Sequence, residues 1–195
     1  ISNSNRSEKA SKLAMQLLSK MESLSRQTIY DLQSSLSAEL AEDYFGSATT
    51  FVAAEIDQIT RKAKILSVGD SRAYLIDAQD KWQQITEDHS ILSELLADFP
   101  DKKEEDFATI YGGVSSCLVA DYSEFQDKIF YQEIEIQQGE SLLLCSDGLT
   151  DGLSEEMREK IWKQYDNDKS RLTVCRKLIT KQKFYDDLSV VICRV

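Results

Sequence analysis

The feature that most constrains the fold is a change in the period of the apolar residues along the chain. In residues 10–21 and 29–40 they recur every three or four positions, which predicts two amphipathic helices, each with one buried face. Residues 49–56 and 63–68 are instead typical of strands and flank a polar turn, which predicts a β-hairpin. The chain therefore begins with a helix pair and continues into a sheet.

The remaining residues alternate between the same two patterns. Residues 128–136 and 142–145 flank a second polar turn and predict a second hairpin, and Asp88 is expected to cap a short helix. This order of elements favours an α+β layered sandwich with mainly antiparallel sheets over an alternating βαβ fold. The further strands are expected at 73–76 and 188–195, and the further helices at 155–165 and 172–181.

Length and charge limit the domain organisation and the partners. With 195 residues the chain is long enough for one core, and we interpret residues 1–195 as a single domain. The apolar runs have the length of strands, whereas a spanning helix needs about 20 apolar residues, so we expect a soluble, cytoplasmic protein. The 23 basic and 34 acidic residues give a net charge of −11, which argues against nucleic acid and membrane partners. A phosphorylated substrate would be repelled unless divalent cations lay between the charges.

The four cysteines do not form a zinc-binding pattern. Cys117, Cys145, Cys175 and Cys193 lie far apart, with no CxxC pair and no histidine nearby. Most of them lie in apolar stretches, so we expect buried free thiols in a reducing cytosol.

Acidic residues stand at the ends of predicted strands. Asp70 follows Gly69 between two strands, and taken alone it is best explained as a turn residue. Asp147 and Asp151 lie around two glycines directly after the strand at 142–145. Their carboxylates could bind magnesium or manganese, although a loop with a helix cap explains them slightly better in isolation.

Asp186 completes a third acidic corner, just before the last predicted strand. Three such corners together are harder to explain as turns, because strand ends can gather at one rim of a sandwich. Five segments then resemble, in identity, order and approximate spacing, the metal-dependent serine/threonine protein phosphatases of the PPM or type-2C family. They are residues 46–50, 67–74, 86–90, 146–151 and 186–190.

The resemblance covers residues 10–195 and implies a fold and a metal site. The fold would be a four-layer α/β/β/α sandwich of two mainly antiparallel sheets flanked by helix pairs. By the family's pattern, Asp147 and Asp186 resemble direct ligands of Mn²⁺ or Mg²⁺, whereas Asp70 and Asp151 resemble ligands of a further, weaker metal or of metal-bound water. Two or three ions are implied. Asp187 stands where the family usually has Asn, and its extra charge could alter metal affinity.

The implied activity is hydrolysis of phosphoserine and phosphothreonine in proteins. A water activated between two metals about 3.5 to 4 Å apart would attack the phosphoryl group, so no cysteine nucleophile is required. The implied partners are a phosphoprotein substrate and a cognate serine/threonine kinase, and we expect a monomer. The alternative is a catalytically inactive, phosphatase-like domain that acts as a regulatory protein-binding module.

Three further expectations concern residues around this site. Family members carry a phosphate-binding Arg and a metal-bridging Asp-Gly motif ahead of the first helix; the sequence begins at Ile1, after that point, so we expect truncation and name no catalytic residue. His89, the only histidine, is expected to form structural hydrogen bonds rather than act as a general acid. Residues 99–108 fall where the family carries a flap. The acidic side chains of this segment would disfavour binding of acidic phosphopeptides, and a solvated loop without such a role explains them equally well.

Overall fold

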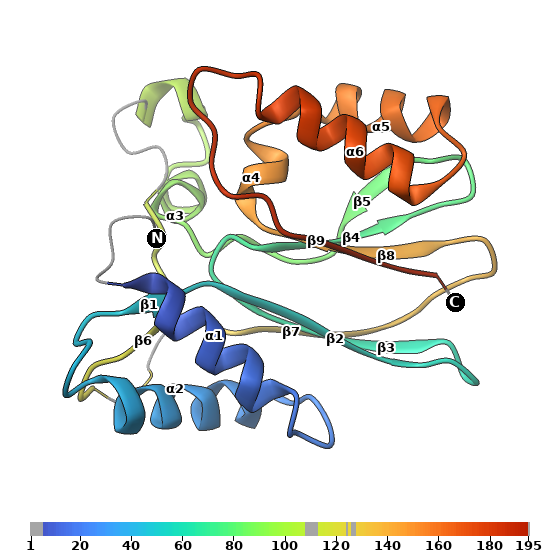
Figure 1. Cartoon of the computed structure of the whole chain (residues 1–195). Helices are drawn as coiled ribbons and strands as arrows, with labels where there is room; N and C mark the ends of the chain where they lie inside the picture. The colour runs from blue at the N-terminus through green and yellow to red at the C-terminus, as the bar shows by residue number, and fades with distance from the viewer. Residues whose placement is uncertain (1–5, 108–112, 124, 126–127, 195) are drawn as a thin grey trace. The chain divides into compact units, whose positions relative to one another are not determined.

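The computed structural model describes residues 6–107, 113–123, 125 and 128–194 (Figure 1). Their contacts divide the chain into two compact units. Unit 1 comprises Ile1–Glu55, Lys64–Asp70 and Asp88–Gln132. Unit 2 comprises Ile56–Ala63, Ser71–Glu87 and Glu133–Val195.

Unit 1 contains the predicted N-terminal helix pair. The first turn of its second helix is fixed by Thr28, whose Oγ1 accepts a hydrogen bond of 3.0 Å from the Ser25 N–H. The elements of this unit are α1 (Ser7–Leu18), α2 (Arg26–Leu40), β1 (Ala48–Thr49), α3 (Ile91–Asp98), the 3₁₀-helix η1 (Glu104–Phe107) and β6 (Leu118–Val119).

Three strands each have residues in both units. They form a sheet in the order β2-β3-β7. Adjacent β2 and β3 confirm the first predicted hairpin. The three strands are β2 (Phe51–Asp57), β3 (Lys62–Val68) and β7 (Phe130–Glu135).

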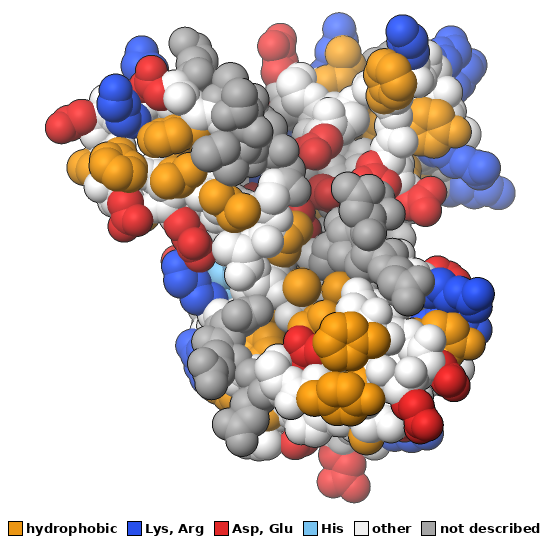
Figure 2. Space-filling view, turned by 90° about the vertical axis from the view of Figure 1, so that its left-hand side faces the viewer, with side chains coloured by type: hydrophobic (Ala, Val, Ile, Leu, Met, Phe, Trp, Pro, Cys, Tyr) orange, Lys and Arg blue, Asp and Glu red, His pale blue; other side chains and the backbone are white. Residues whose placement is uncertain are grey.

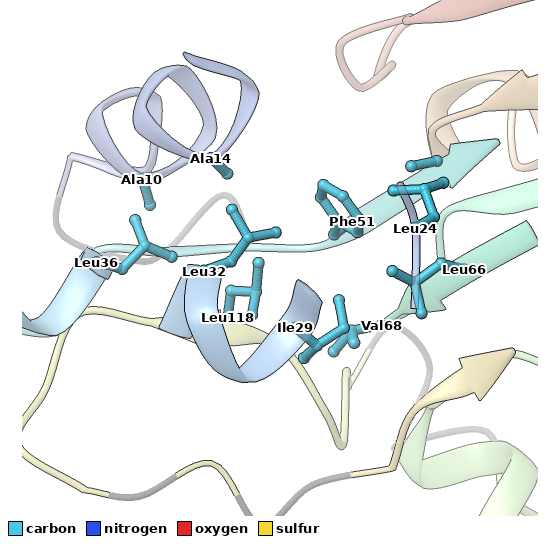
Figure 3. Close-up of a cluster of buried hydrophobic side chains, with 11 residues drawn as sticks. Ala10, Ala14, Leu24, Ile29, Leu32, Leu36, Phe51, Leu66, Val68 and Leu118 are labelled. Atoms are coloured by element: carbon cyan, nitrogen blue, oxygen red, sulfur yellow. The ribbon is translucent and has the colours of Figure 1, made fainter. Parts of the chain in front are cut away.

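The core of unit 1 forms where the apolar faces of α1 and α2 meet the strands. Ala10 and Ala14 of α1 and Leu32 of α2 are at most 1% exposed, and they belong to one cluster with Phe51 and Leu66 (Figure 3). The small alanines allow α1 to lie close to α2, and the larger aliphatic side chains fill the space above the strands. The helical period of the sequence therefore identified the buried faces correctly.

Unit 2 contains a four-stranded antiparallel sheet in the order β5-β4-β8-β9. In its register, Cys145 of β8 lies opposite Arg72 on one side and Val190 on the other. The apolar faces of α5 and α6 share a buried cluster with β4 and β8. The elements are β4 (Arg72–Ile76), β5 (Trp82–Gln84), β8 (Ser141–Cys145), α4 (Asp147–Thr150), α5 (Glu155–Gln164), α6 (Asp168–Ile179) and β9 (Val190–Arg194).

Two sequence predictions about local structure are wrong. Residues 128–145 do not form a hairpin, because β7 is the neighbour of β3 whereas β8 lies between β4 and β9. As a central strand, β8 buries Leu142 and Leu143 almost completely. Asp88 does not cap α3; Ser90 directly precedes the helix, and its Oγ accepts from the Ser93 N–H at 3.1 Å.

Some of the short strands were not expected. β5 completes the edge of the unit 2 sheet, and β1 pairs with β6 through only two residues on each strand. Across the described parts of the chain, no helix combines the length and the apolar character needed to cross a bilayer.

Candidate metal centre

Ser146 connects two acidic segments of unit 2, the one that begins with Asp147 and the one that contains Asp186 and Asp187. Its Oγ donates to the Asp187 carbonyl at 3.0 Å and accepts from the Ser189 N–H at 3.1 Å, while its own N–H donates to the Ser189 carbonyl at 3.0 Å. Since the hydroxyl is used in this way, it does not cap α4. The segment that carries Asp147 is therefore joined to the segment that carries Asp186.

Gly148 allows these two segments to approach closely. A Cβ atom built on this residue would lie 2.4 Å from the Asp187 carbonyl oxygen and 3.2 Å from that of Asp186. The first of these separations is shorter than a real carbon–oxygen contact, so only glycine fits without a shift of the backbone. The glycine after Asp147 thus has a packing role that the sequence pattern alone did not reveal.

Both segments of this corner carry carboxylates at least partly exposed to solvent. Asp147 is partly exposed at the start of α4, and the Asp151 N–H donates to its carbonyl at 2.8 Å, so the two side chains lie one helical turn apart. The Oδ1 of the exposed Asp186 accepts from the Asp187 N–H at 2.7 Å, which orients this carboxylate and leaves its second oxygen available. Such hard oxygen donors suit Mg²⁺ and Mn²⁺.

Asp70 ends a separate, well-fixed corner in unit 1. The preceding Gly69 has a φ of +102°, and a Cβ there would lie 2.4 Å from the Thr50 side chain. His89 holds the same residue twice: its Nδ1 accepts from the Gly69 N–H at 3.1 Å, and its backbone N–H donates to the Gly69 carbonyl at 2.9 Å.

This contact supports the expected structural role of His89. The side chain is only 5% exposed, and its Nδ1 is occupied by a backbone N–H. The sequence shows Gly69 before Asp70 and the only histidine twenty residues later. It does not show that Gly69 and His89 are in contact. The role of Asp70 as a metal ligand stays a prediction.

The carboxylates identified so far do not complete a metal site. Among the residues described, no group of three or more His, Cys, Asp and Glu side chains could hold a metal ion. The donor types of Asp147, Asp151 and Asp186 fit Mn²⁺ or Mg²⁺, but an ion bound there would need further ligands, such as water or another carboxylate. The position of Ile1, on which the expectation of a missing upstream segment rests, lies outside the described residues.

The buried cysteines of unit 2 are unsuited to nucleophilic chemistry. Burial raises the pKa of the Cys145 thiol, which directly precedes Ser146, to about 12, and raises that of Cys175 to about 11. Because the thiolate is the reactive form, both groups stay protonated at neutral pH. The four cysteines are all free, but Cys117 and Cys193 are only partly buried, so the expectation of buried thiols holds for two of them.

The segment predicted to be a flap contains regular structure. η1 forms within it, and the rings of Phe99 and Phe107 are 6.3 Å apart. Residue 108, at the end of the predicted segment, is outside the described ranges.

Comparison with known proteins identifies the family. The sequence model of protein phosphatase 2C matches residues 2–173. The chain is 36% identical over 163 residues to the serine/threonine phosphatase stp of Listeria innocua, which covers 80% of this chain and 60% of that protein. The serine/threonine phosphatase Stp1 of Staphylococcus aureus has a similar backbone, with a TM-score of 0.82 at 22% identity over 100% of this chain and 80% of that one.

A further solved structure is the catalytic domain of the phosphatase PstP in complex with two manganese ions. Its TM-score is 0.73 at 23% identity, over 95% of this chain and 80% of that one. The chain belongs to the protein phosphatase 2C family. The similar backbones confirm the predicted α+β fold class, and the chain spans 60% of the length of the Listeria relative.

Proposed function

We propose that this chain forms the core of a metal-dependent phosphatase that removes phosphate from phosphoserine and phosphothreonine in proteins. Family membership supports this reaction class, and two relatives are named serine/threonine phosphatases. The proposal includes a single catalytic domain that combines both units, a cytoplasmic location, a monomeric state and a cognate serine/threonine kinase in a signalling pathway.

The observation that carries the proposal is the connection between the segments of Asp147 and Asp186. Ser146 joins them by hydrogen bonds to Asp187 and Ser189, and Gly148 lets their backbones touch. These contacts continue the pairing of β8 with β9, in which Cys145 lies opposite Val190, and they bring together two acidic segments that are 39 positions apart in sequence. Preorganised carboxylates are what a divalent metal site requires.

Each residue then has a distinct task. Asp147 and Asp186 would bind Mn²⁺ or Mg²⁺ directly, and Asp151 and Asp70 would hold a further ion or its water ligands. Bound ions would supply Lewis-acid activation of water and neutralise the phosphoryl oxygens. Ser146 keeps the two main carboxylate segments in register, and Asp187 adds negative charge beside them.

Metal-dependent turnover tests the proposal. We expect the protein at its natural length to hydrolyse p-nitrophenyl phosphate and a phosphothreonine peptide with Mn²⁺, and to stop when EDTA is added. Asp147→Asn removes one charged ligand and should lower kcat at least about a hundredfold. Titration calorimetry should show weaker Mn²⁺ binding by the same variant, while its circular dichroism spectrum stays unchanged.

Asp166→Asn is the matched control. Asp166 is exposed between α5 and α6 and makes no ion pair with any described residue, so this variant changes the charge equally and should retain full activity. Turnover that persists without metal, or an Asp147→Asn variant as active as this control, would contradict the proposed site.

The second candidate is an inactive, phosphatase-like regulatory module. It is favoured by one observation: no group of three metal-ligating side chains lies within the described ranges. On this alternative the natural-length protein would bind no Mn²⁺ and hydrolyse neither substrate. Calorimetry and the phosphatase assay therefore separate the two functions in the same preparation.

A further inference from the structure

A groove lies along one face of α2 in unit 1. Its cavity volume is about 830 Å³, and it is lined by one face of the helix and by the segment that follows β6. The lining residues used below are Tyr30, Ser34, Ser37, Glu42, Tyr122 and Phe125. All of them belong to unit 1.

The two walls of the groove are fixed to each other. The buried Gln33 side chain of α2 donates to the Val119 carbonyl at 2.6 Å and accepts from the Val119 N–H at 3.0 Å. At one end, the rings of Tyr30 and Phe125 meet edge to face, with centroids 5.8 Å apart. These contacts hold Gln33, Tyr30 and Phe125 of the lining in place, which reduces the entropic cost of binding.

Aromatic rings line the groove and stay exposed beside it. Tyr122, which lines the groove, is 76% exposed. Its ring centre lies 5.9 Å from that of Phe45, which is 58% exposed and stands beside the groove without lining it. Figure 2 shows hydrophobic side chains together with acidic and basic ones in its lower part, at the height where Figure 1 places α2 and β6. An exposed aromatic pair of this kind is typical of an interaction site.

The charges of the groove and of the helix beside it indicate what the groove would bind. Glu42 is the charged side chain among the described lining residues, and residues 27–45 as a whole contain four acidic residues but no Lys or Arg. Aromatic faces beside a carboxylate attract ammonium and guanidinium groups. Tyr44 already shows this behaviour within the molecule, because the cationic groups of Arg6 and Lys9 each lie 5.4 Å from its ring centre.

We propose that this groove docks a basic peptide segment of a partner protein, with a Lys or Arg side chain against the ring of Tyr122 and the carboxylate of Glu42. The hydroxyls of Ser34 and Ser37 offer hydrogen bonds to the peptide backbone along the same helix face. This site does not depend on the phosphatase activity, because none of the carboxylates proposed to bind metal lines it.

Fluorescence anisotropy with a labelled ten-residue peptide of alternating Arg and Leu tests the inference, and the same peptide with Glu in place of Arg is the comparison. We expect the basic peptide to bind and the acidic one not to bind. Tyr122→Ala and Glu42→Lys should each weaken binding about five- to tenfold, since each removes one contact to the cation. Raising the salt to about 0.5 M should weaken binding further.

Glu22→Lys is the matched control, because Glu22 is exposed in the same unit and does not line the groove. It should bind the basic peptide like the unchanged protein. Equal affinity for both peptides, no binding, or an equal loss in Glu22→Lys and Glu42→Lys would overturn the inference. A dimer in sedimentation that Tyr122→Ala dissociates would also overturn it, because a second copy would then be the occupant. Folding of each variant is checked by circular dichroism.

Discussion

The two units have similar layers but different cores. The core of unit 1 is mainly aliphatic, with Leu32 of α2 fully buried and a single phenylalanine among the most buried residues. The core of unit 2 contains both tryptophans of the chain, Trp82 and Trp162, whose ring centres are 4.6 Å apart. Helices of the same amphipathic pattern can thus cover a sheet with quite different chemistry.

Unit 2 also buries two arginines against these rings. The Arg158 guanidinium lies 5.0 Å from the centre of the Tyr74 ring and 5.1 Å from that of Trp82, and Arg171 lies 5.4 Å from that of Trp162. Both arginines are at most 7% exposed. The difference between the units is therefore that the core cluster of unit 1 is apolar, whereas unit 2 also packs buried guanidinium groups against aromatic rings.

The largest effect is expected from the central aromatic contact of unit 2. Trp162→Ala should lower the free energy of unfolding by about 3 to 5 kcal/mol, because it leaves a large cavity next to Trp82. Leu32→Ala in unit 1 should cost somewhat less, about 2 to 4 kcal/mol. Urea denaturation measures both values, and Ile59→Ala, at a position 95% exposed, should change the value by less than about 0.5 kcal/mol. Equal, small losses in both core variants would show that the cores are not tightly packed.

The two buried arginines should differ although they occupy similar surroundings. Arg171 donates to the carbonyls of Tyr165 and Trp162 at 2.7 and 2.8 Å and pairs with Asp80 and Asp168 at 3.3 Å. Arg171→Met should therefore lower the free energy of unfolding by about 2 to 3 kcal/mol.

Arg158 provides the matched comparison. Its Nε and Nη1 have no hydrogen-bond partner among the described residues, so its desolvation is poorly compensated. Arg158→Met keeps the packing of the side chain and should change the free energy of unfolding by no more than about 1 kcal/mol. The same urea experiment applies, and a loss in Arg158→Met as large as that in Arg171→Met would contradict the distinction.

The smallest effect concerns pH. The Arg194 guanidinium donates to Asp168 at 2.6 and 2.9 Å and holds the pKa of that carboxyl below its ordinary value of 3.8. Because the folded state binds this proton less readily, the stabilisation is present above pH 3.8 and is lost as the pH falls through the lowered value. Asp168→Asn should thus lower the free energy of unfolding at pH 6 by at most about 1 kcal/mol, which a lower melting temperature would report. The effect should be smaller near pH 3.

Asp166→Asn, on the neighbouring loop, should lower the melting temperature at neither pH. A melting temperature of Asp168→Asn that matches this control at pH 6 would show that the ion pair at the end of the sheet contributes nothing to unit 2.

Several elements could be predicted from the sequence because their signals are local. The period of α1 and α2 and the turn between β2 and β3 depend on neighbours in the chain. The neighbours of β8 could not be predicted in the same way. Its polar turn after β7 looks like that of a hairpin, and only the burial of its apolar residues between β4 and β9 decides the pairing.

The same distinction applies to the candidate site. The sequence by itself determined which residues are acidic and that Asp70, Asp147 and Asp186 stand near strand ends, and this was enough to propose them as candidate metal ligands. Only the tertiary structure decided that Gly148 touches the backbone at Asp186 and Asp187, and that His89 fastens the turn before Asp70. The physical reason is that carboxylate chemistry is a property of single residues, whereas closeness between distant segments depends on packing and hydrogen bonds formed only in the folded chain.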